Sequence, residues 1–204
     1  MKRAYIVAAG DFDNKNIHPK KNDIVIAADA GFYYLKKIGI TPDYVIGDFD
    51  SGDEPDFNNK IKLKREKDRT DTYEAMKLAE EKHANEIFIY AALGGRVSHS
   101  IANIISLVEF TLKGIKTKII SNDKIIFAIN KNIKIENPQK GYYSIFSFTD
   151  KCEGITLKGF KYELENFTLK NTDALGVSNE INENKNYIEI NLKSGVLLVV
   201  YEKK

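Results

Sequence analysis

The sequence contains one cysteine, no tryptophan and four prolines in 204 residues. With Cys152 as the single thiol, no disulfide can form within the chain, which excludes the small disulfide-stapled class of secreted domains. A chain of this length can bury roughly 70% of its unfolded surface, so it needs neither a disulfide nor a structural metal to be stable. This cysteine usage predicts a reducing compartment and a cytoplasmic location.

Long hydrophobic runs and an excess of one charge are also missing. The longest apolar runs, such as GVLLVVY at 195–201, are too short to span a bilayer. The apolar stretch near the start ends at Asp11, so we do not interpret it as a signal peptide. The net charge of +2 gives no general argument for binding nucleic acid or an anionic membrane. We therefore expect neither of these as a partner.

The first part of the chain alternates strand-like and helix-like segments. The runs AYIVAAG and DIVIAAD are continuously apolar, as is typical of strands covered on both faces. Helices are expected over 30–39, 70–83 and 100–114, two of them ended by glycine, and Asp71 and Glu74 have capping-box spacing. Strand–helix alternation predicts a mostly parallel sheet with helices on both faces.

After about residue 125 the pattern changes to short alternating runs. Seven such runs are separated by Gly, Asn, Pro or Asp, beginning with KIIFAIN and ending with GVLLVVYE. Regularly spaced short strands with turn signals predict an all-β sandwich or barrel. The sequence therefore predicts two domains, with a boundary near 122–135 and no internal repeat.

Three polar loops follow predicted strands of the first domain, at 47–53, 66–71 and 94–100. Open parallel sheets bind ligands beyond the carboxyl ends of their strands, so these loops are the expected site. The sequence has neither a Walker A motif nor G-x-G-x-x-G. A nucleotide, if bound, is therefore held in some other way.

The loop at 47–53 carries Asp48 and Asp50 on either side of Phe49. In an extended segment alternate side chains share a face, so both carboxylates would point the same way and suit Mg²⁺ with substrate phosphates. The alternative is a solvated loop in which Asp favours turns. Asp29 either caps the helix at 30–38 or lies on the same sheet edge as Asp48.

The second loop carries Asp68 and Asp71 after a basic run. The cations are Lys60, Lys62, Lys64, Arg65, Lys67 and Arg69. Asp71 could simply cap the helix, but a helix start with Thr70 could also meet a phosphate. Carboxylate, lysine and helix start together are typical of phosphoryl transfer, where cations neutralise developing charge. The alternative for most of the lysines is a solvated strand edge.

The third loop, GGRVSHS, combines two glycines with a cation. Gly94 and Gly95 let backbone approach a ligand, and Arg96 offers a forked donor suited to phosphate. His99 could be a ligand or base, although a histidine opening a helix is more often structural. Ser98 could simply be the helix N-cap.

Five stretches together resemble the thiamin pyrophosphokinase family. They are AADAGFYYL, TPDYVIGDFDS, KDRTDTYEA, LGGRVSHSIANI and GVSNE, in the family's order and spacing. The resemblance implies an α/β ATP-binding catalytic domain over 1–125 and a thiamin-binding β-sandwich over 126–204. It implies Mg²⁺-dependent transfer of pyrophosphate from ATP to the thiamin hydroxyl, giving thiamin diphosphate and AMP. It also implies a homodimer with the thiamin site at the interface.

The resemblance assigns roles residue by residue. It implies magnesium ligands at Asp48, Asp50 and Asp71, and ATP or active-site contacts at Asp29, Lys67, Asp68, Thr70, Gly94, Gly95 and Arg96. It implies that Ser178 and Asn179 reach thiamin from the sandwich. Asp71, Asp50 and Arg96 are the expected catalytic residues, with Asp71 as the first choice of proton acceptor.

Two positions depart from the family pattern. Ser98 stands where the family commonly has Asp, which argues against an acid role there. The chain has no tryptophan to stack on thiamin, so Tyr or Phe would have to stack instead. Two alternatives stay open: a glycosyltransferase that binds metal through D-x-D, which does not explain KDRTD, and a non-catalytic nucleotide sensor.

Overall fold

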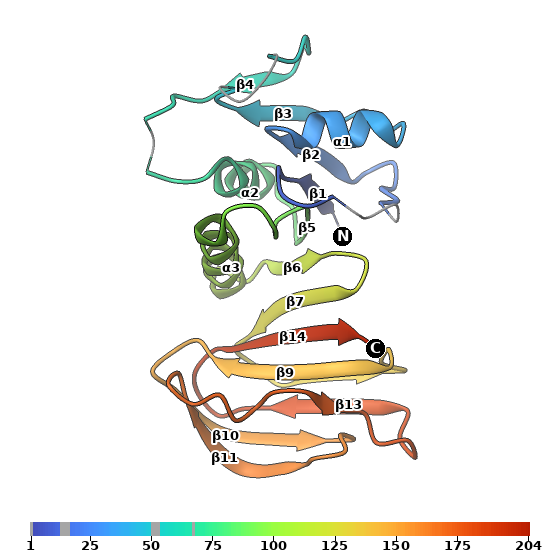
Figure 1. The fold of residues 1–204 in the computed structure, drawn as a ribbon, viewed down its shortest axis with the longest axis vertical. Helices are drawn as coiled ribbons and strands as arrows, with labels where there is room; N and C mark the ends of the chain where they lie inside the picture. Colours follow the sequence, from blue (N-terminus) through green and yellow to red (C-terminus); the bar gives the residue numbers. More distant parts are fainter. Residues whose placement is uncertain (1, 13–16, 50–53, 67) are drawn as a thin grey trace. The chain divides into compact units, whose positions relative to one another are not determined.

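The computed structural model describes residues 2–12, 17–49, 54–66 and 68–204 (Figure 1). Its contacts divide the chain into two compact units, 1–122 and 123–204. The sequence placed the boundary between 125 and 126, inside the expected range of 122–135. The two units are described separately below.

The described residues of the first unit include six parallel strands in the order β6-β5-β1-β2-β3-β4. The strands are β1 (Arg3–Val7), β2 (Ile24–Ala28), β3 (Tyr44–Gly47), β4 (Lys60–Lys62), β5 (Glu86–Tyr90) and β6 (Lys116–Ile120). Every residue of β2 is buried, as expected for a strand covered on both faces. The predicted parallel α/β sheet is confirmed.

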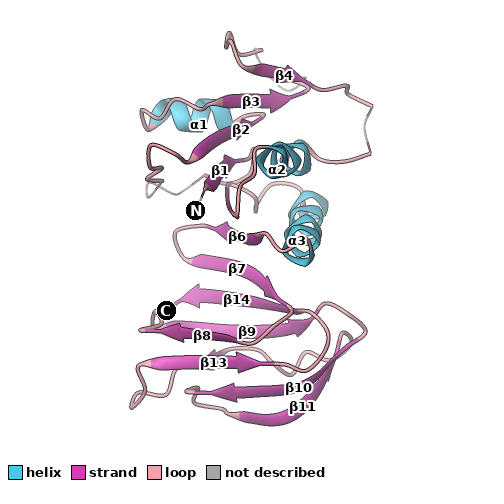
Figure 2. Ribbon diagram, turned by 180° about the vertical axis from the view of Figure 1, so that it is seen from behind, coloured by secondary structure: helices cyan, strands magenta, loops and turns pink. Residues whose placement is uncertain are grey.

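Three helices cover this sheet: α1 (Gly31–Lys37), α2 (Asp71–Glu81) and α3 (Val97–Leu112). Figures 1 and 2 show α2 and α3 on one side of the sheet and α1 on the other. Leu35 of α1 is fully buried in a cluster with Val7, Val25 and Val45, which come from β1, β2 and β3. Ile6 points to the opposite face of β1 and is also fully buried, so both faces of this strand are covered.

Local details differ from the sequence prediction in several places. The third helix begins at Val97 rather than Ser100. Thr70, not Asp71, caps α2, because its side-chain oxygen accepts a hydrogen bond from the Tyr73 amide at 3.1 Å. The predicted glycine ends of α1 and α3 are confirmed, since Gly39 and Gly114 have φ of 72° and 86°.

The basic run at 60–69 is partly a strand edge. Lys60 and Lys62 lie in β4, the last strand of the sheet, and both ammonium groups pair with Glu54 at 2.7 and 2.6 Å. Arg69 lies 3.8 Å from the Glu109 carboxylate and over the Tyr73 ring. Lys60 and Lys62 therefore lie on a strand edge, as the alternative predicts, and Arg69 has partners outside the strand.

The second unit is a β-sandwich of two antiparallel sheets (Figure 2). One contains β7 (Lys124–Ile129), β9 (Gly141–Ser147), β12 (Asn179–Glu180) and β14 (Leu197–Lys203), and the other contains β8 (Ile133–Glu136), β10 (Lys151–Lys158), β11 (Leu164–Lys170) and β13 (Tyr187–Asn191). The two sheets share one hydrophobic core, to which Ile145 and Leu197 contribute from the first sheet and Ile155 from the second. The predicted α/β plus β-sandwich fold is confirmed. Among the described helices, none is long and apolar enough to cross a membrane.

Candidate active site

Three carboxylates from separate segments meet at the carboxyl end of the parallel sheet. Asp29 follows β2, Asp48 follows β3, and Asp71 is the first residue of α2. One ligand oxygen from each lies within 4.8 Å of the other two, and all three residues are half-buried. The sequence predicted Asp48 and Asp71 as metal ligands and placed Asp29 on this edge, and the structure brings the three together.

The alternative of helix capping does not explain these acids. Ala30 occupies the N-cap of α1 and Thr70 that of α2, so neither Asp29 nor Asp71 is a cap. Asp29 has a φ of 49°, a left-handed conformation that is unfavourable for residues other than glycine. Phe49 and Ala91 share this conformation at the ends of β3 and β5. Such strained residues cluster where a site fixes the backbone.

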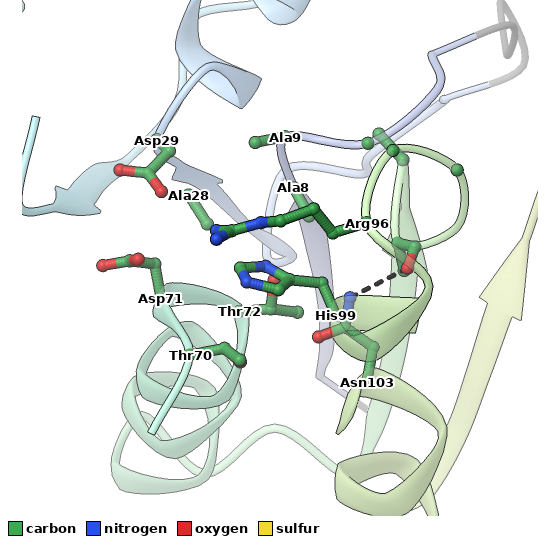
Figure 3. A pocket seen from close by; sticks show the side chains of 15 residues that line it. Ala8, Ala9, Ala28, Asp29, Thr70, Asp71, Thr72, Arg96, His99 and Asn103 are labelled. Carbon is green, nitrogen blue, oxygen red and sulfur yellow. Dashed lines mark hydrogen bonds between the residues drawn. The ribbon is translucent and has the colours of Figure 1, made fainter. Parts of the chain in front are cut away.

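A cavity of about 310 Å³ opens beside these acids (Figure 3). Its lining comes from the ends of β1, β2 and β5 and from the starts of α2 and α3. The lining residues are Ala8, Ala9, Gly10, Ala28, Asp29, Thr70, Asp71, Thr72, Ala91, Ala92, Gly94, Gly95, Arg96, His99 and Asn103. Alanine and glycine dominate the strand ends, so a ligand can approach the backbone closely there.

Arg96 supplies the positive charge of this cavity. It is the N-cap residue of α3, and its side chain reaches across the cavity toward Asp29 and Asp71 (Figure 3). No side chain among the described residues caps α3 by a hydrogen bond. A helix start presents backbone N–H groups and a partial positive charge, so this end of the cavity favours anions. Ser98 is inside the helix, so the alternative that it is the N-cap is wrong.

Gly94 and Gly95 form the loop that leads into α3, with φ of 86° and 61°. A Cβ atom at Gly94 would also collide with the carboxylate of Asp11. Glycine is therefore favoured at position 94 by conformation and by the nearby Asp11 carboxylate, and the backbone contact with a ligand that the sequence predicts for this loop stays a prediction.

Comparison with known proteins places this geometry in a family. The family model described as the catalytic domain of thiamin pyrophosphokinase matches residues 17–119, and that described as its vitamin B1 binding domain matches 130–197. The thiamine pyrophosphokinase of Bacillus subtilis (strain 168) is 30% identical, with 98% of each chain covered. This chain belongs to the thiamin pyrophosphokinase family.

Solved structures agree with this assignment. The thiamine pyrophosphokinase structure from Bacillus subtilis matches with a TM-score of 0.87 and 27% identity over 99% of both chains. A thiamin pyrophosphokinase structure from Geobacillus thermodenitrificans has a TM-score of 0.86 at 23% identity, covering 99% of this chain and 98% of that one. At 23% identity, the similarity to the second structure supports the fold alone. The family and fold predicted from the sequence are confirmed.

Three site residues that the sequence predicts for this thiamin pyrophosphokinase family member are not found in the cavity lining. Asp50 and Lys67 fall outside the described residues. Asp68 is exposed and does not line the cavity. These three assignments stay predictions.

Ser178 and Asn179 belong to the second unit, in and just before β12. Ser178 is exposed with a φ of 58°, and its amide donates to Ser144 Oγ at 3.0 Å. The Asn179 side chain donates to Tyr162 O at 2.7 Å and accepts from the amides of Tyr162 and Glu180. Asn179 therefore holds a turn of the sandwich, and a thiamin contact for either residue stays a prediction.

The sequence analysis missed Asn103 as a residue of the site. It lies on the buried side of α3, one turn after His99, where an apolar residue would be expected. A polar side chain on the core face of an amphipathic helix was the available signal.

Proposed function

We propose that this chain transfers a pyrophosphoryl group from ATP to the hydroxyl of thiamin, giving thiamin diphosphate and AMP. The observation that carries the proposal is the meeting of Asp29, Asp48 and Asp71 beside a cavity that Arg96 spans from its far side. Acids for a metal ion and cations for phosphates are the parts that phosphoryl transfer needs.

The three carboxylates fit Mg²⁺. This ion prefers hard oxygen ligands at about 2.1 Å, so oxygens on one ion lie at most about 4.2 Å apart. One ligand oxygen from each acid lies within 4.8 Å of the other two, so small side-chain rotations would bring the three oxygens onto one ion. When bound there, Mg²⁺ would neutralise charge on the polyphosphate and draw the acids together. Asp50, two residues after Asp48, is proposed as a further ligand.

Residues of the first unit would hold the phosphates. Arg96 reaches toward the acids, the start of α3 lines the same cavity, and the glycine loop leaves room for backbone contacts. Lys67 is proposed as a second cation. These groups fix the polyphosphate in position, and positioning together with charge neutralisation supplies most of the acceleration expected for such a transfer.

In the proposed reaction the thiamin hydroxyl oxygen forms a bond to the β-phosphorus of ATP. The bond from this phosphorus to the oxygen bridging the α- and β-phosphates breaks, and AMP leaves with that electron pair. The hydroxyl proton goes to a nearby acid, for which Asp71 is proposed because it lines the cavity and borders the phosphate end.

The second unit is proposed to bind thiamin. The support is the match of residues 130–197 to the vitamin B1 binding domain of the family. We further propose a homodimer in which Ser178 contributes to the thiamin site at the interface. Because the Asn179 amide already makes three hydrogen bonds within the sandwich, its contribution would be to hold this segment.

A product assay tests the function. Purified protein is incubated with ATP, Mg²⁺ and thiamin, and nucleotides and thiamin esters are separated by chromatography. We expect AMP and thiamin diphosphate in equal amounts, with no product when Mg²⁺ is chelated. ADP with thiamin monophosphate, sugar transfer from a nucleotide sugar, or no turnover would each contradict the proposal.

A further inference from the structure

Asn103 contributes a buried acceptor atom to the lining of the cavity. The residue is 5% exposed, and its Nδ2 donates to the carbonyl oxygen of Ala92 at 2.8 Å. Its Oδ1 is buried and has no hydrogen-bond partner among the described residues. A buried polar atom without a partner destabilises a fold, so such an atom in a ligand cavity requires an explanation.

The orientation of the Asn103 amide is fixed by its neighbour. A carbonyl oxygen can accept but cannot donate, so the group that faces Ala92 must be the NH₂. The atom on the other side of the amide is therefore an oxygen, and it can pair with nothing but a donor. Figure 3 shows this oxygen on the opposite side of the amide from the dashed hydrogen bond.

His99 is the cavity-lining side chain of α3 nearest to Asn103 in the sequence. That side chain lies one helical turn before Asn103, is exposed, and lines the same cavity. Exposed side chains change rotamer within nanoseconds. Because the Asn103 oxygen is buried, a neighbouring side chain must move before a ligand can reach it, and the exposed His99 is free to change rotamer.

The chemistry of the acceptor selects which part of a ligand it can meet. Phosphate oxygens are acceptors, so the polyphosphate belongs at the other end of the cavity, near Arg96 and the acids. The nucleoside carries donors, namely the two ribose hydroxyls and the amino group of adenine. We propose that Asn103 Oδ1 accepts a hydrogen bond from the nucleoside of the bound nucleotide and so determines nucleotide specificity.

This inference rests on the proposed function for the identity of the ligand, but binding can test it without turnover. ATP, 2′-deoxy-ATP, 3′-deoxy-ATP and purine riboside triphosphate are titrated calorimetrically into the protein with Mg²⁺ and without thiamin. The analogues remove one donor each. We expect one of the three to bind about 10-fold to 100-fold more weakly than ATP, because it leaves the buried acceptor unpaired. The affected analogue identifies the donor.

Two variants assign the effect to Asn103. Asn103→Leu keeps the approximate volume but removes the acceptor, so it should bind ATP and the affected analogue with equal, weakened affinity. Ser106→Ala is the matched control. Ser106 is equally buried on α3, but its Oγ donates to Ala102 O at 2.8 Å and it does not line the cavity. This control should keep the wild-type discrimination.

The inference is wrong if wild type binds all four nucleotides with similar affinity. It is also wrong if folded Asn103→Leu discriminates as wild type does. Circular dichroism establishes whether the leucine variant folds, and if it does not, the wild-type series decides alone. Failure of the product assay with intact nucleotide discrimination would overturn the proposed reaction and leave the role of Asn103 standing.

Discussion

A Cβ atom at Gly47 would collide with Oδ1 of Asp29. Gly47 is the last residue of β3, and the Asp29 amide donates to the carbonyl of its neighbour Ile46 at 2.9 Å. The missing side chain at position 47 therefore provides the space in which the Asp29 carboxylate turns toward Asp48 and Asp71. The GDFDS motif contributes this space as well as its acids.

Gly47→Ala should lower activity by at least about tenfold while the protein stays folded. The added methyl group would displace the Asp29 carboxylate, and small displacements of catalytic groups cost rate steeply. Steady-state assay of AMP release, with urea unfolding in parallel, measures both effects.

Gly114→Ala is the matched control for that substitution. Gly114 has nothing near its Cβ position but has a φ of 86°, so alanine is strained there. We expect a loss of about 1 kcal/mol in the free energy of unfolding with unchanged activity. Equal activity of the Gly47 variant and this control would refute the spatial argument.

The acid cluster makes a separate prediction about magnesium. Asp29→Asn and Asp48→Asn should each raise the Mg²⁺ concentration for half-maximal activity about tenfold or more, because an amide oxygen replaces an anionic ligand. Asp56→Asn serves as control, since Asp56 is exposed and lies outside the cluster. Magnesium titrations of the three variants decide the matter, and an unchanged titration for Asp29→Asn would exclude that residue as a ligand.

The fold was largely predictable because its signals are local. Continuous apolar runs identified β1 and β2 as strands covered on both faces, and glycines located the ends of α1 and α3. The error at the start of α3 has a physical reason. Arg96 occupies its N-cap without a side-chain cap bond, so the usual Ser, Thr or Asp signal is missing there.

The candidate site was predictable in part. The motif order located Asp48, Asp71 and Arg96 on one edge of the sheet, because the ends of parallel strands gather there. Capping roles could not be resolved, since Thr70 and Asp71 are both good caps and the choice depends on backbone geometry. Asn103 escaped notice because its role depends on which carbonyl faces it across the fold.

Thr70 has a structural task that can be separated from phosphate contact. Its Oγ1 accepts from the Tyr73 amide, so Thr70→Ala should lower the free energy of unfolding by about 1 kcal/mol. Thr70→Ser keeps the hydroxyl and should restore stability. Because serine also keeps the hydroxyl, the alanine variant is the one that tests phosphate contact: unchanged kcat/KM in folded Thr70→Ala would assign the hydroxyl to the cap alone. Activity that stays low in the stable serine variant would point to a substrate contact through the threonine methyl group.

The buried Tyr143 leads us to expect that the free energy of unfolding of the sandwich falls at alkaline pH. Burial, with a smaller contribution from the nearby Tyr201, raises the pKa of Tyr143 from 10.0 to about 12. The folded state therefore holds this proton more tightly than the unfolded state. The resulting stability is fully present below pH 10 and is lost as the pH rises from 10 to 12. Two pKa units correspond to about 2–3 kcal/mol.

Tyr143→Phe isolates this contribution from other groups that titrate in the same range. The variant loses the hydrogen bond from Tyr143 Oη to Gln139 O at 3.0 Å, so it should be about 1 kcal/mol less stable at pH 8. Above pH 10 its unfolding midpoint in urea should fall less steeply than that of wild type. Tyr142→Phe is the control, because adjacent strand residues point to opposite faces and Tyr142 is half-buried beneath Lys204. Parallel pH profiles for wild type and Tyr143→Phe would show that the buried phenol is not the group whose ionisation destabilises the sandwich.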